Sequence, residues 1–168
     1  MSASLFGRRL RLERTNNLST NGAMRGLSFS KEVQITSAQL LALNATPQTL
    51  VAAPGTGRML IFQQAFFYLP YNSAAYGGIA AGEDLAIRYT GSSGQIVGTQ
   101  ETTGFLDQTS SQRRLLYAGA SPVATATDVV PVSNAALVLH LLTGEITTGN
   151  SPLNVRVFWF EVPDTVTP

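Results

Sequence analysis

The sequence predicts an all-β protein, an antiparallel β-sandwich of the jelly-roll kind with an extended N-terminal arm. Of its 168 residues, 44% are hydrophobic and only 12% are charged, whereas about 25% of the residues of an average soluble domain are charged. Short runs of alternating apolar and polar side chains are separated by segments rich in Gly, Pro, Ser and Asn, as in strands joined by turns. About seven to nine strands can be placed in this way, and this number favours a sandwich.

The charge pattern divides the chain into a basic arm, residues 1–31, and a β-sandwich domain, residues 32–168. The arm contains six basic residues and one acidic residue, a net charge of +5, and the domain contains five basic and nine acidic residues, a net charge of −4. The arm is rich in Asn, Ser, Thr and Gly, and such a segment buries too little apolar surface to offset the entropy lost on folding. We therefore expect the arm to be mobile until it binds a partner.

Two kinds of partner fit the arm. Clustered arginines neutralise phosphates and would suit a nucleic acid, whereas apolar side chains among them suit docking on a protein. We favour protein docking because the arginines are few and leucine and phenylalanine side chains accompany them. The arm residues that we expect to contact a partner are Phe6, Arg8, Arg9, Leu10, Arg11, Leu12 and Arg14.

The first half of the domain contains three predicted strands and a short helical segment. Residues 33–36 alternate apolar and polar side chains and predict the opening strand. Ser37 is a suitable N-cap for one or two helical turns over residues 38–43. Residues 49–52 and 58–69 predict two further strands, and the Pro- and Gly-rich turn between them predicts that they pair as a hairpin. The longer of these two strands is expected at the centre of the core.

Residues 70–82 predict a loop that carries aromatic side chains. Tyr71 and Tyr76 are expected to contact a partner, because aromatic enrichment is typical of protein-binding surfaces. The alternative is that both rings pack on the end of the sheet.

A second hairpin is predicted from residues 85–90 and 95–99, which flank a Gly- and Ser-rich turn. The pattern of residues 102–117 is too weak to assign to a helix or a strand. Within it, Arg113 and Arg114 form either a solvated turn or a clamp at an interface, and the solvated turn is favoured.

The last third of the chain predicts one edge strand and two central strands. Residues 124–132 are rich in Thr and Val, but the prolines in and beside this run confine it to an edge. Residues 136–142 and 153–162 are apolar enough for central strands. The connection between them is dense in turn residues, so we expect these two strands to pair antiparallel.

The sequence excludes several kinds of chemistry. It contains no cysteine, so disulfides, thiolate metal sites and cysteine nucleophiles are excluded. Gly55-Thr56-Gly57 resembles part of a phosphate-binding loop, but the residues after it predict a strand where such a loop requires a helix. No apolar run approaches the roughly 20 residues that cross a bilayer, and no signal peptide is evident, so residence in the cytoplasm is expected.

No catalytic set is evident either. His140 is the single histidine and falls within an apolar strand, where a structural role is favoured over acid–base catalysis. Glu83 and Asp84 could approach Asp107 or Glu101, but their spacing matches no calcium-binding loop. We therefore predict that the protein is not an enzyme and uses no cofactor and no metal.

Two segments resemble a known family. Residues 35–58, which begin Ile35-Thr36-Ser37-Ala38-Gln39, and residues 139–162, which include the connection from Thr143-Gly144 to Gly149-Asn150-Ser151-Pro152, are similar to small structural proteins encoded beside the head genes of tailed bacteriophages. The resemblance implies a head decoration or cement protein that binds the major capsid protein at the capsid surface, often as a homotrimer. Such a protein is assembled into the virion in the host cytoplasm. The basic arm departs from the minimal domain of that family.

Two alternatives remain open at this point. The first is a receptor- or carbohydrate-binding module of a head fibre or tail tip that uses the loop from Tyr71 to Tyr76. The second is a jelly-roll coat protein whose Arg-rich arm packages nucleic acid. Capsid decoration is favoured, with no nucleic-acid or membrane partner.

Overall fold

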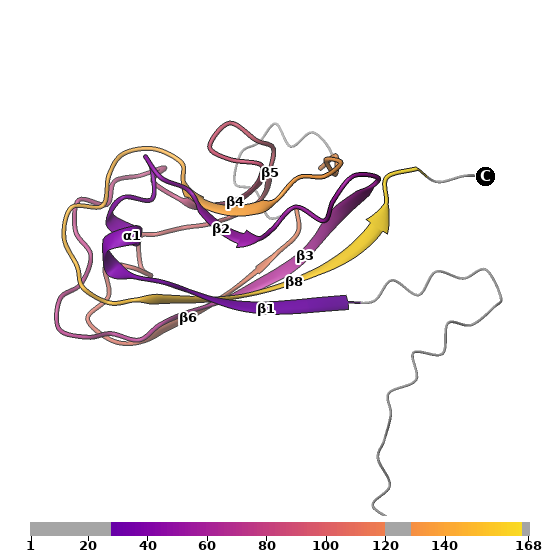
Figure 1. Cartoon of the computed structure of the whole chain (residues 1–168). Helices are drawn as coiled ribbons and strands as arrows, with labels where there is room; N and C mark the ends of the chain where they lie inside the picture. Colours follow the sequence, from indigo (N-terminus) through magenta and orange to yellow (C-terminus); the bar gives the residue numbers. More distant parts are fainter. Residues whose placement is uncertain (1–27, 120–128, 166–168) are drawn as a thin grey trace, which may run out of the picture.

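The computed structural model describes residues 28–119 and 129–165, which form two antiparallel sheets of four strands each, packed face to face (Figure 1). The prediction of an all-β sandwich is confirmed. Sheet A consists of β1 (Ser28–Ile35), β8 (Leu153–Pro163), β3 (Arg58–Leu69) and β6 (Gln112–Tyr117), in that order. Sheet B consists of β2 (Gln48–Val51), β7 (Leu137–Leu141), β4 (Leu85–Tyr89) and β5 (Ile96–Gln100), in that order.

The order of the strands is that of an eight-stranded jelly roll. The chain passes from one sheet to the other at every connection except the one between β4 and β5. Each sheet therefore contains strands that are distant in the sequence, as in the two Greek keys of a jelly roll. The longest strand, β3, lies between β8 and β6 in sheet A, so the prediction that residues 58–69 are central is confirmed.

The predicted pairing of strands is correct for one hairpin and wrong for two. β4 and β5 pair antiparallel as expected. β2 pairs with β7 rather than with β3, and β7 and β8 lie in different sheets. In both wrong cases the turn residues carry the chain across the sandwich instead of back along the same sheet. Gly55 and Gly57, with φ of +101° and +80°, adopt the conformation that permits the first of these crossings.

Three elements differ in position from the prediction. β6 lies in the stretch that had no assignment, and residues 129–132 of the predicted edge strand are not in a strand; residues 124–128 lie outside the described residues. β1 begins at Ser28, so residues 28–31 belong to sheet A rather than preceding the domain.

The short helix α1 (Ser37–Leu41) is capped by Thr36 rather than by Ser37. The Thr36 hydroxyl accepts a hydrogen bond from the Gln39 backbone N–H at 3.2 Å, and the Gln39 side-chain oxygen accepts one from the Thr36 backbone N–H at 2.9 Å. This reciprocal arrangement is a capping box, which satisfies backbone donors that the helix itself cannot pair.

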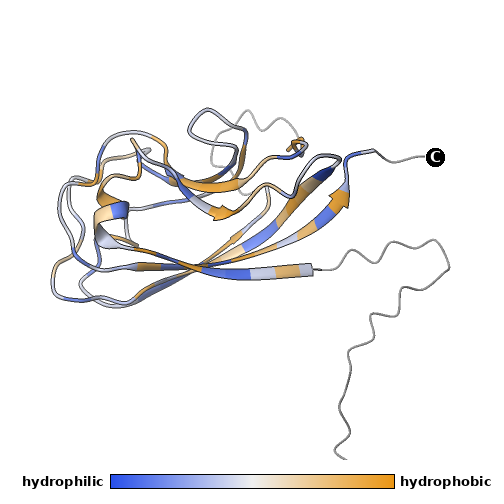
Figure 2. Ribbon diagram, viewed as in Figure 1, coloured by the Kyte–Doolittle hydropathy of each residue, from blue (hydrophilic) through white to orange (hydrophobic). Residues whose placement is uncertain are grey.

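The core lies between the inner faces of the two sheets. Sheet A contributes alternate residues such as Leu60, Phe67 and Val155, and sheet B contributes residues such as Ile87 and Leu139, all of them buried. Hydrophobic residues accordingly mark the strands of both layers in Figure 2. α1 buries its one core residue, Leu40, at one end of the sandwich (Figure 1).

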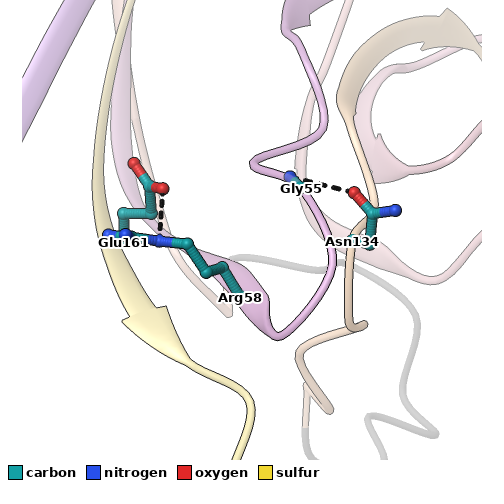
Figure 3. Close-up of polar contacts among 4 residues, drawn as sticks. All are labelled: Gly55, Arg58, Asn134 and Glu161. Atoms are coloured by element: carbon teal, nitrogen blue, oxygen red, sulfur yellow. Dashed lines mark hydrogen bonds and ion pairs between the residues drawn. The ribbon is translucent and has the colours of Figure 1, made fainter.

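The opposite end of the sandwich is held by polar contacts (Figure 3). The Asn134 side-chain oxygen accepts a hydrogen bond from the backbone N–H of Gly55 at 3.0 Å, and the Asn134 backbone N–H donates to the Arg58 carbonyl at 2.8 Å. Arg58 also forms an ion pair with Glu161 at 2.6 Å. Asn134 has a positive φ of 49°, which Asn tolerates better than most residues.

One polar contact joins the two sheets inside the core. The phenolic O–H of Tyr89, in β4, donates a hydrogen bond of 2.5 Å to the backbone carbonyl of Leu60, in β3. Both residues are almost completely buried. The bond therefore fixes the position of sheet B relative to sheet A in a region from which water is excluded.

Substituting Tyr89→Phe should lower the free energy of unfolding by about 1 to 3 kcal/mol, because the Leu60 carbonyl would be buried without a donor. Urea unfolding monitored by tryptophan fluorescence measures the change. Tyr117→Phe, at a side chain that is 57% exposed, is the matched control and should leave the stability unchanged. Equal stability of the two variants would show that the Tyr89 hydroxyl does not link the sheets.

Candidate partner-binding surface

The tyrosines predicted to contact a partner lie in the loop between β3 and β4. Tyr71 is half-buried, and its hydroxyl donates to the Ser73 carbonyl at 2.9 Å. Tyr76 is a core residue whose hydroxyl donates to the Ser151 carbonyl, and burial raises its pKa to about 12. The structure thus supports the alternative, in which the Tyr76 ring packs inside the fold and offers almost no surface to a partner.

The arm residues predicted to bind a partner, Phe6, Arg8, Arg9, Leu10, Arg11, Leu12 and Arg14, lie outside the described residues.

The acid–base residues singled out in the sequence lie on or beside sheet B. His140 is buried, and its Nε2–H donates to the Asn44 carbonyl at 3.1 Å. Burial chiefly, with a contribution from the charge of Arg88, lowers the pKa of the His140 imidazole. Burial first, and then the neighbouring Glu101 carboxyl, raises the pKa of Asp84.

Within residues 28–119 and 129–165, no three His, Asp or Glu side chains lie close enough to share a metal ion. In the same ranges, no helix has the length and hydropathy that crossing a membrane requires.

The outer face of sheet A has a different character. β3 alternates between buried residues such as Phe67 and outward residues such as Phe66. The register places Phe66 beside Leu115 of β6, and Ile61 beside Phe160 of β8. Residues paired across neighbouring strands form rows across the sheet. In the row between the Phe66–Leu115 pair and the Ile61–Phe160 pair, Gln64 of β3 lies between Phe158 of β8 and Tyr117 of β6. We call the following set the apolar face of sheet A: Ile61, Phe66, Leu115, Tyr117, Phe158 and Phe160.

This apolar face is open to solvent where it reaches β6. The exposed fractions are 36% for Phe66, 47% for Leu115 and 57% for Tyr117, and the other three members are half-buried. Among the described residues, no exposed large hydrophobic side chain lies in sheet B. The outward positions of sheet B are occupied instead by residues such as Ala86, Val138 and His140, which are buried. The two sides of the sandwich are therefore chemically different.

Charged and polar residues border the apolar face. Glu32 of β1 and Arg156 of β8 form an ion pair of 2.6 Å in which both side chains are 54% exposed. In the next row, the Gln34 amide donates to the Asn154 side-chain oxygen at 3.1 Å. Gln64 lies within the face, between Phe158 and Tyr117, and the other polar groups lie around it. Apolar residues surrounded by a polar rim are typical of a protein interface.

Arg113 and Arg114 lie in β6, so the prediction that they form a solvated turn is wrong. The guanidinium of Arg113 lies 4.7 Å from the centre of the Tyr68 ring, on the outer side of sheet A. The guanidinium of Arg114 lies 5.2 Å from the centre of the buried Phe105 ring and donates to the Gly104 carbonyl. Arg113 therefore shows that an arginine can stack on an aromatic ring of this surface.

The sequence reasoning missed the apolar face, although a signal for it exists. Phe66-Phe67, Leu115-Leu116 and Val157-Phe158 are pairs of adjacent apolar residues, and successive residues of a strand point to opposite faces. Such pairs indicate strands that are apolar on both faces.

Comparison with known proteins found no matching protein family, no matching curated protein and no matching solved structure.

His140→Gln should make the stability of the protein less sensitive to acid. The pKa of His140 is lowered in the fold, so the unfolded chain takes up the proton first. The stability that the neutral imidazole provides is present above pH 6.5 and is lost as the pH falls below this value. Urea unfolding at pH 7.5 and 5.5 should show a smaller difference for His140→Gln than for the wild type. If the loss of stability between pH 7.5 and pH 5.5 is the same in the variant and in the wild type, His140 is not held neutral by the fold.

Proposed function

We propose that the protein is a structural virion component that binds and stabilises a bacteriophage capsid shell through protein–protein contacts, as a decoration or cement protein. The observation that carries the proposal is the apolar face of sheet A, on a jelly-roll sandwich whose described residues include no group of His, Asp and Glu that could hold a metal ion. Its partners would be the major capsid protein and further copies of itself, as a homotrimer. Its place would be the capsid surface, reached by assembly in the host cytoplasm.

The energetics of the apolar face support a binding role. Large exposed apolar patches are uncommon on monomeric soluble proteins and mark sites of interaction. Phe66 and Phe158 bring aromatic rings to the patch, and aromatic residues are enriched among those that dominate binding energy. Burying such a ring removes a large apolar area from water, at about 25 cal/mol per Å². The half-buried members cost little entropy to fix because strands already hold them.

The low charge of the chain fits a permanent place in an assembly. Only 12% of the residues are charged, and charged residues are depleted at the centres of interfaces. Of the described charged groups nearest the apolar face, Arg156 and Glu32 are paired with each other, and Arg113 lies at the border of the face, stacked on Tyr68. A partner that covers the centre of the face would therefore not have to desolvate an unpaired charge there.

The proposal predicts that the purified chain binds to phage capsid shells that lack it, at a fixed ratio to the major capsid protein. Phe66→Ser in the full chain should weaken this binding about tenfold or more, because it removes an aromatic ring from the contact surface. Val130→Ser is the matched control, since Val130 is 62% exposed but lies outside sheet A. Co-sedimentation with shells measures the binding of the wild-type protein and of each variant. Wild-type protein that does not sediment with any shell would refute the proposed function.

A second candidate is a jelly-roll coat protein whose arm packages nucleic acid. The strand order favours it, because this topology occurs in the domains of viral capsids. The charge of +5 on residues 1–31 is compatible with phosphate binding. The carbohydrate-binding alternative is less well supported, since Tyr76 is buried and its loop offers no pair of exposed rings.

Salt dependence separates the coat-protein candidate from decoration. A decoration protein should bind single- or double-stranded DNA and RNA only weakly in a filter-binding assay at 150 mM salt. A packaging arm with five or six phosphate contacts would bind tightly at low salt and lose affinity steeply as the salt concentration rises. Replacing Arg8, Arg9, Arg11 and Arg14 by Gln would then reduce the slope. Tight, salt-dependent binding that this variant abolishes would favour packaging over decoration.

A further inference from the structure

We propose that the apolar face of sheet A binds the N-terminal segment, residues 1–27, of a second copy of this chain. The inference rests on the proposed function, because it names the occupant of the surface through which the protein is proposed to hold its neighbours. Three features support this choice of occupant: the position at which the segment joins the fold, its side chains, and its charge.

The segment joins the fold beside the apolar face. Ser28, the first residue of β1, is paired with Phe160 of β8, which is paired in turn with Ile61 of β3. The 27 residues before Ser28 can span at most about 90 Å. The eight residues of β1 span only about 26 Å. The segment is therefore long enough to cover the corresponding face of a neighbouring molecule.

The direction of β1 favours a neighbouring copy over the same chain. From Ser28, β1 runs toward Glu32, which pairs with Arg156 in the row that contains Phe66 and Leu115. A chain that continues backwards from Ser28 along the line of β1 therefore leads away from that row. Contact with its own Phe66 would require a reversal of direction at the start of β1, whereas contact with a second molecule requires none.

The side chains of the segment match the surface. Leucine and phenylalanine side chains would bury apolar area against the aromatic rings of sheet A. The arginines between them can stack on the same rings, as Arg113 already does on Tyr68 at 4.7 Å. The apolar residues of the segment are Leu5, Phe6, Leu10, Leu12, Leu18, Met24 and Leu27, among others.

The charges of the segment and of the rest of the chain are opposite. Residues 1–27 contain five arginines and one glutamate, a net charge of +4, and residues 28–168 contain six basic and nine acidic residues, a net charge of −3. These sum to the +1 of the whole chain. The segment of one copy is therefore attracted to the body of another, which favours their encounter and disfavours contact between two segments.

Self-association of the full chain tests the inference. Sedimentation velocity over a range of protein concentrations should show the wild type associating. Two variants should each associate more weakly, by about tenfold or more. The face variant carries Phe66→Ser and Leu115→Ser. The segment variant carries Phe6→Ser, Leu10→Ser and Leu12→Ser. Val130→Ser should associate like the wild type. Thermal unfolding of each variant shows that the fold is retained.

Mixing the two variants distinguishes contact between copies from contact within one chain. The face variant retains an intact segment, and the segment variant retains an intact face, so an equal mixture should form pairs that neither variant forms alone. A mixture that remains monomeric would overturn the inference, and so would a wild type that is monomeric at every concentration. Undiminished association of the segment variant would also overturn it, because two faces would then pair directly.

Binding of the wild-type chain to shells is measured separately from the association of the mixed variants, so either proposal can fail without the other. If the chain associates through segment and face but binds no shell, the proposed function fails and the inference stands. If the chain binds shells but the mixture of variants does not associate, the inference fails and the proposed function stands.

Discussion

The burial of one face of each sheet against the other is the constraint on which the rest of the structure depends. The inner faces meet through residues such as Phe67 and Leu139, which are completely buried. Because the jelly-roll connections cross between the sheets at almost every turn, neither sheet can form its pattern of neighbours without the other. The hydrogen bond from Tyr89 to the Leu60 carbonyl adds one directional contact to this otherwise non-directional packing.

The outer sides of the two sheets differ in the exposure of their apolar side chains. Several outward positions of sheet B, such as Ala86, Val138 and His140, are buried, whereas the exposed Phe66, Leu115 and Tyr117 all lie on sheet A. A sandwich with one apolar side is suited to attach to other molecules in a single orientation. This property is useful to a subunit that must lie in a defined way on a larger assembly.

Binding by such a surface needs no reactive group. The polar rim formed by Glu32 and Arg156 is paired within the chain, so the energy of association would come mainly from the apolar centre, and the rim would contribute orientation. The arginine stacked on Tyr68 shows how cationic and aromatic side chains combine on this surface. The opposite charges of residues 1–27 and 28–168 provide a second, longer-ranged attraction that would operate before the apolar contact forms.

Local patterns in the sequence indicated every strand of the fold except β6, and composition excluded the chemistry of cysteine. The alternation in residues 85–90 and the Gly-rich turn after it identified the hairpin of β4 and β5, because a hairpin is a local structure whose turn and register are set by neighbouring residues. The absence of cysteine and the unequal charge of the two parts were likewise evident from composition.

Only the tertiary structure decided which strands are neighbours and which apolar residues remain exposed. The turns after β2 and after β7 have the composition of hairpin turns, yet both carry the chain to the other sheet, since the packing of distant strands outweighs the preference of a loop. Phe66 and Phe67 are identical side chains at adjacent positions, and no local pattern distinguishes them. Phe67 is buried and Phe66 is exposed because the register of β3 between β8 and β6 turns one of them toward sheet B.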